Sequence, residues 1–259
     1  MTTSLHALLL LSDSALPLGS FAFSNGLESH LAHTKHRQPQ SPTQHPSRIS
    51  SITSTSLPTF LVFLHQTLQN TASLSLPYLL HAYTDPTRLS ALDDTLDAAT
   101  PCTVARRAST VQGRALLTLW ERSLSLSCPA SPAKDVLASF AEQLKAARQD
   151  AFGCAANGHF APLFGVVCAA MGLSRAEAGY VFLLNQAKGV VSAGVRASVM
   201  GPYQGQTVLG GGELRGWIEG LVEEEIQRSR DVEEAGVAVP VLDLWIGRHE
   251  LLYSRIFNS

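Results

Sequence analysis

The chain has 259 residues, of which 45% are hydrophobic and 15% charged, and its formal net charge is −2. A nearly neutral chain has no global attraction for nucleic acid or for anionic lipid, so neither is an expected partner. No stretch approaches the roughly 20 apolar residues that a membrane span needs. The apolar run Leu8 to Leu11 is short and follows no Lys or Arg, which argues against a signal sequence. We therefore expect a cytoplasmic protein.

The first chemical pattern lies near the N-terminus. The string Leu11 to Glu28 reads as a helix, a turn at Pro17 and Gly19, and a second helix that presents Phe21 and Phe23. After it, 16 of the 21 residues from Gln38 to Pro58 are Ser, Thr, Pro or Gln. Such a segment has little to pack, so we expect a flexible insertion at residues 38–58.

Most of the remaining chain has helical periodicity. Apolar residues are dense from Leu57 to Tyr83, and Ser174 to Ala197 opens with a capping box. The glycines at 210–212 lead into another helix, and a last helix is expected from about Leu242 to Phe257. Further apolar stripes are formed by Ala108, Val111, Ala115 and Leu119, by Leu137, Phe140, Leu144 and Ala147, and by Leu214, Trp217, Ile218, Leu221 and Ile226.

No series of β-branched strands with hairpin turns is present. The pattern therefore predicts an all-α fold of about nine or ten helices, packed as one bundle-like domain over residues 1–259. The four cysteines form no C-x-x-C pair, which favours reduced thiols over a disulfide framework or a zinc site.

Motifs for catalysis are largely missing. No Walker A loop occurs, and the three glycines at 210–212 have neither its lysine nor a dinucleotide-binding spacing, so no cofactor is expected. Ala22 to Gly26 faintly resembles a nucleophile elbow, which leaves a serine hydrolase using Ser24 as an alternative. That elbow needs a strand before the serine, and none is expected here.

Histidines raise a second alternative. His30, His33 and His36 suit a transition metal, but on one helix their steps of three sweep about 120°, so all three converge poorly. Exposed histidines are the main interpretation, and nickel storage through His30 and His33 is the alternative. For His159, before an apolar helix, a capping or buried polar role is expected rather than metal ligation.

The string Ser12 to Glu28 resembles the signature of UreF-type urease accessory proteins. Weaker similarities follow in the family's order: Arg106 to Arg114, Gly158 to Gly165, Ser192 to Pro202, and Arg248 to Ser259. Together they span nearly the whole chain. The departures are the insertion at residues 38–58, and Gly194 where the family usually has alanine.

The resemblance implies a specific function. Such proteins are all-α dimers that bind the accessory protein UreD (also called UreH). Together they recruit the GTPase UreG, and the assembly delivers nickel to apo-urease. The resemblance therefore implies a non-enzymatic scaffold that regulates the GTPase, with metal chemistry left to its partners.

The same resemblance suggests partner-binding residues. Arg196 is the first candidate for contact with the GTPase, and Arg255 for pairing with acidic groups on UreD or within a dimer, since a guanidinium makes bidentate contacts. Tyr253 and Phe257 would share one helical face that docks into a groove. The other candidates come from the N-terminal string: Ser14, Pro17, Gly19, Phe21, Phe23 and Glu28.

Overall fold

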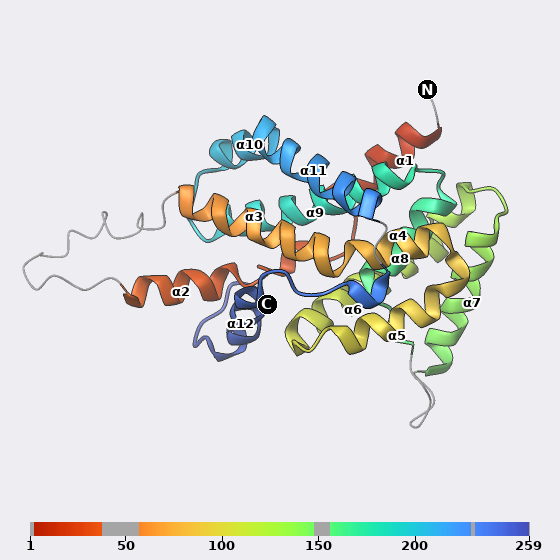
Figure 1. Cartoon of the computed structure of the whole chain (residues 1–259), viewed down its shortest axis with the longest axis horizontal. Coiled ribbons are helices and arrows are strands. Elements are labelled where there is room, and N and C mark those ends of the chain that lie inside the picture. Colours follow the sequence, from red (N-terminus) through yellow and green to blue (C-terminus); the bar gives the residue numbers. More distant parts are fainter. Residues whose placement is uncertain (1–2, 38–56, 148–155, 229–230, 259) are drawn as a thin grey trace, which may run out of the picture.

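The computed structural model of the chain describes residues 3–37, 57–147, 156–228 and 231–258, and these residues form helices and connections without a strand (Figure 1). The predicted all-α class is confirmed. Most of the predicted insertion, residues 38–56, lies outside the described residues. Its last two residues, Leu57 and Pro58, belong to the first turn of a helix.

The series runs to α12, which is more than the nine or ten helices expected. The Leu57–Tyr83 segment is split at Ser75, and a new helix begins at Leu76 with Pro77 in its first turn, where proline is well tolerated. The bounds are Thr3–Leu11 (α1), Leu27–Arg37 (α2), Leu57–Leu74 (α3), Leu76–Thr84 (α4), Leu89–Ala99 (α5), Thr103–Arg122 (α6), Pro132–Ala147 (α7), Phe160–Ala170 (α8), Arg175–Arg196 (α9), Pro202–Gly210 (α10), Gly212–Arg228 (α11) and Pro240–Arg248 (α12).

The core is centred on α8, which is buried along almost its whole length. It packs against α4, α6, α7 and α9, and the buried apolar residues of all these helices form one hydrophobic cluster. Helices α4 and α8 approach closely at Gly165, where an added Cβ would lie 2.2 Å from the carbonyl oxygen of Leu79. The α4–α8 contact therefore depends on a residue without a side chain.

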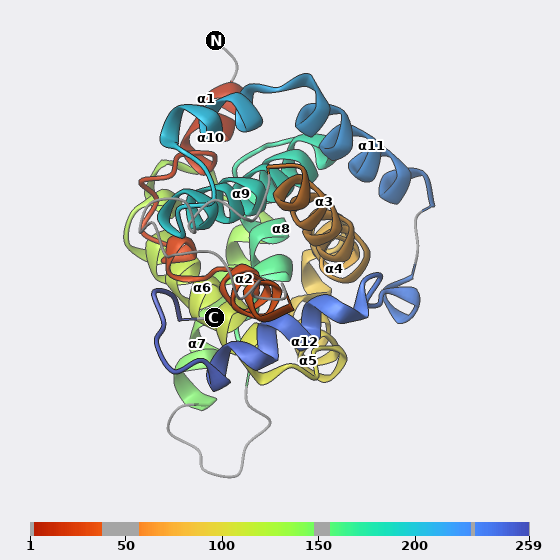
Figure 2. The same cartoon turned by 90° about the vertical axis from the view of Figure 1, so that its left-hand side faces the viewer.

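The long helix α9 crosses the centre of the molecule between α3 and α8 (Figures 1 and 2). Its predicted capping box is confirmed, with reciprocal hydrogen bonds between Ser174 and Glu177. Near its other end, an added Cβ on Gly194 would lie 2.7 Å from the Phe60 ring. The fully buried Phe60 ring thus occupies the space that an alanine would need.

The predicted last helix, Leu242 to Phe257, is wrong. The α-helix ends at Arg248, a short 3-10 turn follows at His249–Leu251, and Leu252 is extended. The backbone N–H groups of Ile256 and Phe257 donate to the Glu28 carboxylate and not to carbonyls four residues earlier. As a result Tyr253 is fully exposed and Phe257 is buried, so they do not share a helical face.

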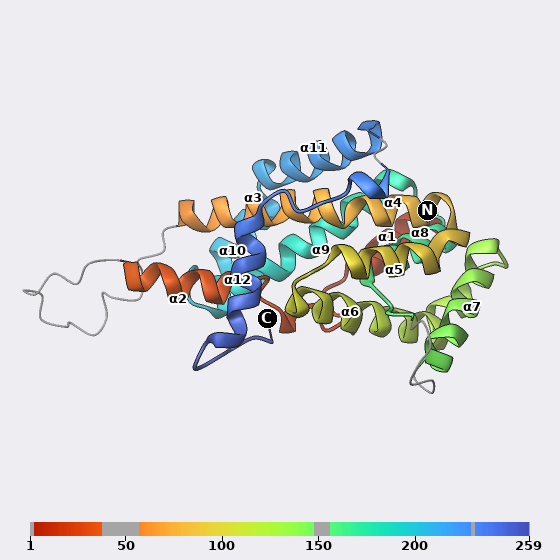
Figure 3. The same cartoon turned by 60° about the horizontal axis from the view of Figure 1, so that its bottom comes forward.

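The C-terminal end of the chain lies against α2 and the segment that precedes it. Helices α2 and α12 lie side by side at one end of the molecule, and the chain then returns towards the start of α2 (Figures 2 and 3). The backbone N–H of Asn258 donates to the carbonyl of Ala22 over 2.8 Å. Among the described helices, none combines the length and the apolar character that crossing a membrane requires.

Candidate functional site

Residues 12–26, called the elbow here, connect α1 to α2 by an irregular path. Three of its residues have positive φ: Gly19 at 73°, Asn25 at 54° and Gly26 at 83°. At Gly26 an added Cβ would also lie 3.0 Å from the backbone nitrogen of Ile246 in α12. Gly26 is thus required both for its backbone angle and for the approach of α12. The turn expected at Gly19 coincides with one of these positive angles.

Helix α9 holds the end of α1 and the elbow through three side chains that donate to backbone carbonyls. Asn185 Nδ2 donates to Leu11 O over 2.9 Å, and the Lys188 ammonium donates to Ser12 O. Further along, the Arg196 guanidinium donates to Phe21 O. Burial lowers the pKa of Lys188, while the nearby Asp13 carboxylate opposes this shift. Lys188 and Arg196, two cations of α9, therefore both hold the elbow in place.

Residues 249–258, called the tail here, are organised by Glu28 of α2. Its carboxylate lies 2.9 Å from His249 Nε2, and it accepts from the backbone N–H of Ile256 over 2.8 Å and of Phe257 over 3.3 Å. The Glu28 side chain is only 13% exposed and the His249 side chain is fully buried. Bonds to a sheltered carboxylate are stronger than neutral ones, so Glu28 is the main polar anchor of the tail.

Phe257 joins the tail to α9. Its ring is 4% exposed, and the Arg196 guanidinium carbon lies 4.3 Å above the ring centroid. This is a cation–π contact. Arg196 therefore links the elbow, through Phe21 O, with the tail, through Phe257. We call the assembly of elbow, tail, Glu28 and Arg196 the elbow–tail junction.

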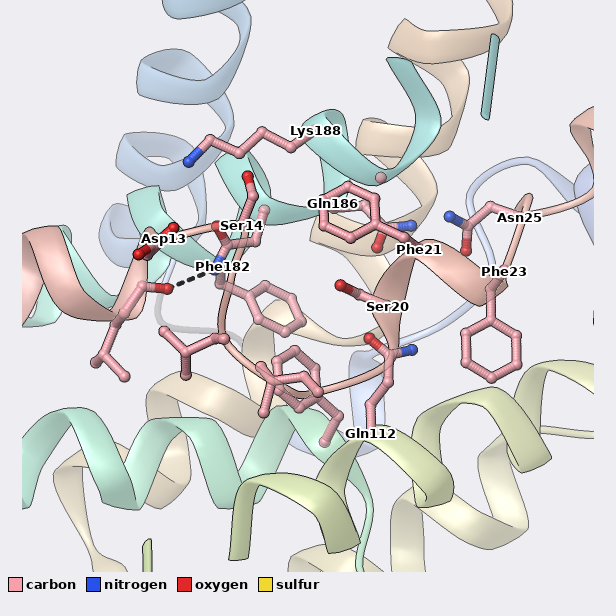
Figure 4. Close-up of a pocket in the computed structure, with 16 residues that line it drawn as sticks. Asp13, Ser14, Ser20, Phe21, Phe23, Asn25, Gln112, Phe182, Gln186 and Lys188 are labelled. Atoms are coloured by element: carbon pink, nitrogen blue, oxygen red, sulfur yellow. Dashed lines mark hydrogen bonds between the residues drawn. The ribbon is translucent and has the colours of Figure 1, made fainter. Parts of the chain in front are cut away.

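A small cavity of about 40 Å³ lies beneath the elbow. Figure 4 shows Ser20 of the elbow facing it, with Phe182 and Gln186 of α9 and Gln112 of α6 around it. On the outer side, a groove of about 380 Å³ runs between the elbow, α9 and α10, and Lys188 and Arg196 both line it. Ser14 and Phe21 lie on its elbow side.

The structure brings most candidate residues together, but in different environments. Phe23 and Phe257 are buried, and Phe21 and Glu28 are half-buried. The exposed candidates are Ser14, Pro17, Gly19, Arg196, Tyr253 and Arg255, of which Arg196 also builds the junction. The predicted set therefore divides into residues that build the junction and residues that it presents to solvent.

Several residues of the junction were not predicted. His249 lies within the matched tail sequence, but its role was not predicted, because its pairing with Glu28 joins positions 221 apart. Arg107 of α6 forms an ion pair with Glu250 over 2.8 Å, and Lys188 reaches Ser12. A buried histidine beside a carboxylate at a helix end carries no distinctive spacing, so the sequence alone has no signal for it.

Comparison with known proteins identifies the family. The family model named UreF matches residues 55–211, more than half of the chain. A urease accessory protein UreF-like protein of Schizosaccharomyces pombe is 33% identical over 99% of this chain and 98% of its own length. The chain belongs to the UreF family.

Other UreF-family proteins are similar across kingdoms. Urease accessory protein UreF of Haemophilus influenzae is 30% identical over 99% of this chain and 96% of its own length. Urease accessory protein F of Oryza sativa is 30% identical over 95% of this chain and 82% of its own length. The resemblance stated from the sequence motifs is thereby confirmed.

The histidines of α2 do not form a metal centre in the described part of this UreF-family chain. The His30 ring packs 5.2 Å from Phe63 and 5.6 Å from Trp245, and the His33 ring lies 5.3 Å from Trp245. No group of three or more potential ligands is found among the described residues, and the His36 side chain lies outside them. Burial lowers the pKa of His30. The expectation of solvent-exposed histidines is wrong for His30 and His33, which are half-buried and pack helices together.

The hydrolase alternative for Ser24 is not supported. Ser24 is completely buried, so a substrate does not reach it, and no strand precedes it within the described residues. His159, in contrast, has the expected buried polar role: its side chain is fully buried and bonded on both ring nitrogens.

Proposed function

We propose that this chain is a non-catalytic adaptor in urease maturation. It forms a homodimer that binds a UreD/UreH-type accessory protein, and the resulting complex recruits a UreG-type GTPase. The adaptor regulates that GTPase while nickel is delivered to apo-urease. Membership of the UreF family supports the role in urease maturation, and the elbow–tail junction supports the assignment of the surfaces.

The observation that carries the proposal is an apolar surface beside the junction. Helix α12 and the tail expose five large apolar side chains, which we call the tail patch: Val241, Leu244, Leu251, Tyr253 and Ile256. The exposed fraction is 65% for Leu244, 79% for Leu251 and 106% for Tyr253. Large apolar groups in a contiguous exposed segment mark a protein interface more often than single ones do. We assign the tail patch to the UreD/UreH-type partner.

The groove between Lys188 and Arg196 is the surface assigned to the GTPase. Both cations line this groove, and their hydrogen bonds hold the elbow. Because Arg196 also contacts Phe257, binding of a partner at the elbow would be coupled to the tail. An adaptor that must recruit one protein only after binding another requires such a link between two surfaces.

Co-purification tests the proposal. The variant Leu251→Ala,Tyr253→Ala should lose most of the UreD/UreH-type partner, because large exposed apolar side chains are frequent interface anchors. Leu126→Ala is a matched control, since Leu126 is 80% exposed but lies outside the tail patch, on the 3-10 turn Leu124–Ser127. Equal recovery of the partner by both variants would contradict the assignment. Light scattering of the isolated chain tests the homodimer.

A further inference from the structure

A polar cavity of about 140 Å³ lies between α3, α6, α9 and α12. Among the described residues that line it, Asp243 of α12 is the only charged one, and its side chain is half-buried. Within the described part of the chain, the Asp243 carboxylate has no hydrogen bond and no ion pair. Burial raises the pKa of Asp243, because the carboxylate loses hydration without gaining a partner. The cavity therefore contains a negative charge that the chain itself does not compensate.

Other side chains of the lining add hydrogen-bond acceptors. The Thr67 hydroxyl donates to Phe63 O over 2.8 Å, and the Thr71 hydroxyl donates to Thr67 O over 2.9 Å. The proton of each hydroxyl is thus used within α3. Gln112 Nε2 donates to Ala108 O over 3.1 Å, which leaves its Oε1 as an acceptor. The lining also carries amide donors, but its described residues include no Lys, Arg or His, so the cavity favours a cation.

Asp243 lies next to the tail patch. Val241 and Leu244 flank it on α12 and are 42% and 65% exposed, whereas Leu242 and Ile246 line the cavity together with it. A partner that covers Val241 and Leu244 also shields the half-buried carboxylate between them. A charge that loses its water in an interface is costly unless the other side supplies an opposite charge. The tail patch thus fits a partner that places a cation at Asp243.

We propose that the UreD/UreH-type partner inserts a lysine side chain into this cavity, where its ammonium group pairs with Asp243. The inference rests on the proposed function and adds the chemistry of one contact to it. An ammonium group donates in three directions, which suits acceptors spread over α3, α6 and α12, whereas a guanidinium donates within one plane.

The size of the cavity agrees with this occupant. A cavity of about 150 Å³ holds a molecule the size of benzene, so 140 Å³ accommodates the end of a lysine side chain. The apolar stem of a lysine packs on apolar surface while its charged end lies elsewhere, and the tail patch offers such a surface.

The stability of the free chain gives the first test, which needs no partner. Asp243→Asn keeps the shape of the side chain and removes an unpaired charge, so the urea midpoint of unfolding should stay the same or rise. Asp93→Asn is the contrasting variant, because the Asp93 carboxylate accepts the N–H groups of residues 157–159, and its midpoint should fall. A lower midpoint for Asp243→Asn would show that Asp243 has a partner within the chain, and would overturn the inference.

Calorimetric titration of the full chain with the UreD/UreH-type protein gives the second test. Asp243→Asn should weaken binding about tenfold, less than the full cost of breaking a buried charge pair, because the site is half-buried. Asp135→Asn, an exposed carboxylate on α7, should leave binding unchanged. Normal binding by Asp243→Asn would refute this inference alone. Absence of binding by the unmodified chain would refute the proposed function, and this inference with it.

Carbodiimide coupling identifies the cation. The reagent joins a carboxylate to an amine in contact with it through an amide bond, so it reports lysine and not arginine. Peptide mass spectrometry of the complex should show Asp243 linked to a lysine of the partner, and Asp243→Asn should remove this link. A link from Asp243 to a lysine of its own chain, or no link in a complex that Asp243→Asn weakens, would overturn the assignment of a partner lysine.

Discussion

The α4–α8 contact and the elbow–tail junction are stabilised in opposite ways. At α4–α8 apolar side chains and a glycine bring two backbones together without any charged group. At the junction, charged side chains of α2 and α9 hold irregular backbone by hydrogen bonds across 175 or more positions of sequence. The first arrangement gives rigidity. The second can be rearranged by exchanging a few bonds, which suits a surface that binds partners.

The largest expected effect is in the core. Gly165→Ala would place a Cβ 2.2 Å from Leu79 O, so the two helices must separate. We expect a loss of about 3 kcal/mol in the free energy of unfolding, at the upper end for overpacking, measured by urea denaturation. Gly189→Ala is the control, because a Cβ there meets nothing within 4 Å, and helix propensity favours alanine. Equal destabilisation by both changes would contradict the claim that the close approach of α4 and α8 at Gly165 requires a glycine.

At the junction, Glu28→Gln should lower the free energy of unfolding less than Gly165→Ala does, and its effect should be confined to the tail. The change replaces the charged acceptor of three hydrogen bonds by a neutral amide, and we expect a loss of about 1.5 kcal/mol. Hydrogen exchange should show faster exchange at the amides of Ile256 and Phe257, with α8 unchanged. If exchange in the tail is unaffected, Glu28 is not its anchor.

Acidification should lower the free energy of unfolding through His30 of α2, which packs against Phe63 and Trp245. Burial lowers the pKa of His30 below its ordinary value of 6.5, so the unfolded chain binds more protons than the folded chain as the pH falls below that value. Stability should therefore decrease from pH 7 towards pH 5. His30→Gln should make the decrease shallower, as measured by denaturation at each pH. An identical pH dependence in the variant would contradict a contribution from His30.

The smallest effect is expected for Arg196→Lys. Lysine retains the charge but loses the planar group that stacks on Phe257, and the difference is about 0.5 kcal/mol, or a factor of two to three in tail protection. Hydrogen exchange of the tail measures it. Arg215→Lys on α11, which pairs with Glu219 on the surface, is a matched control that should leave the tail unchanged.

The helical class was predictable because it depends on local signals. The capping box at Ser174 and the turn at Gly211 appear in the sequence as they do in the structure. The apolar stripe assigned to α6 was less accurate: Val111 is 48% exposed, whereas Leu116 and Trp120 are buried. Periodicity does not decide which face of a helix meets a neighbour when apolar residues occur on both.

The sequence motifs contain most residues of the elbow–tail junction, but they do not reveal how these residues are arranged. The motif around Phe21 and Glu28 and the tail around Phe257 were identified separately, and their contact through Glu28 and Arg196 required the fold. The tail was expected to be helical because Tyr253 and Phe257 have helical spacing. Its backbone instead bonds to Glu28, 228 positions before Ile256, and local spacing carries no information on such a partner.

We propose that the elbow–tail junction and the tail patch form the partner interface. Hydrogen exchange of the chain with and without the UreD/UreH-type protein tests it most directly. We expect added protection at residues 241–258 and in the elbow, with α7 unchanged. Protection confined to α7 and the neighbouring turn around Leu126, with unchanged exchange at the junction, would contradict the claim.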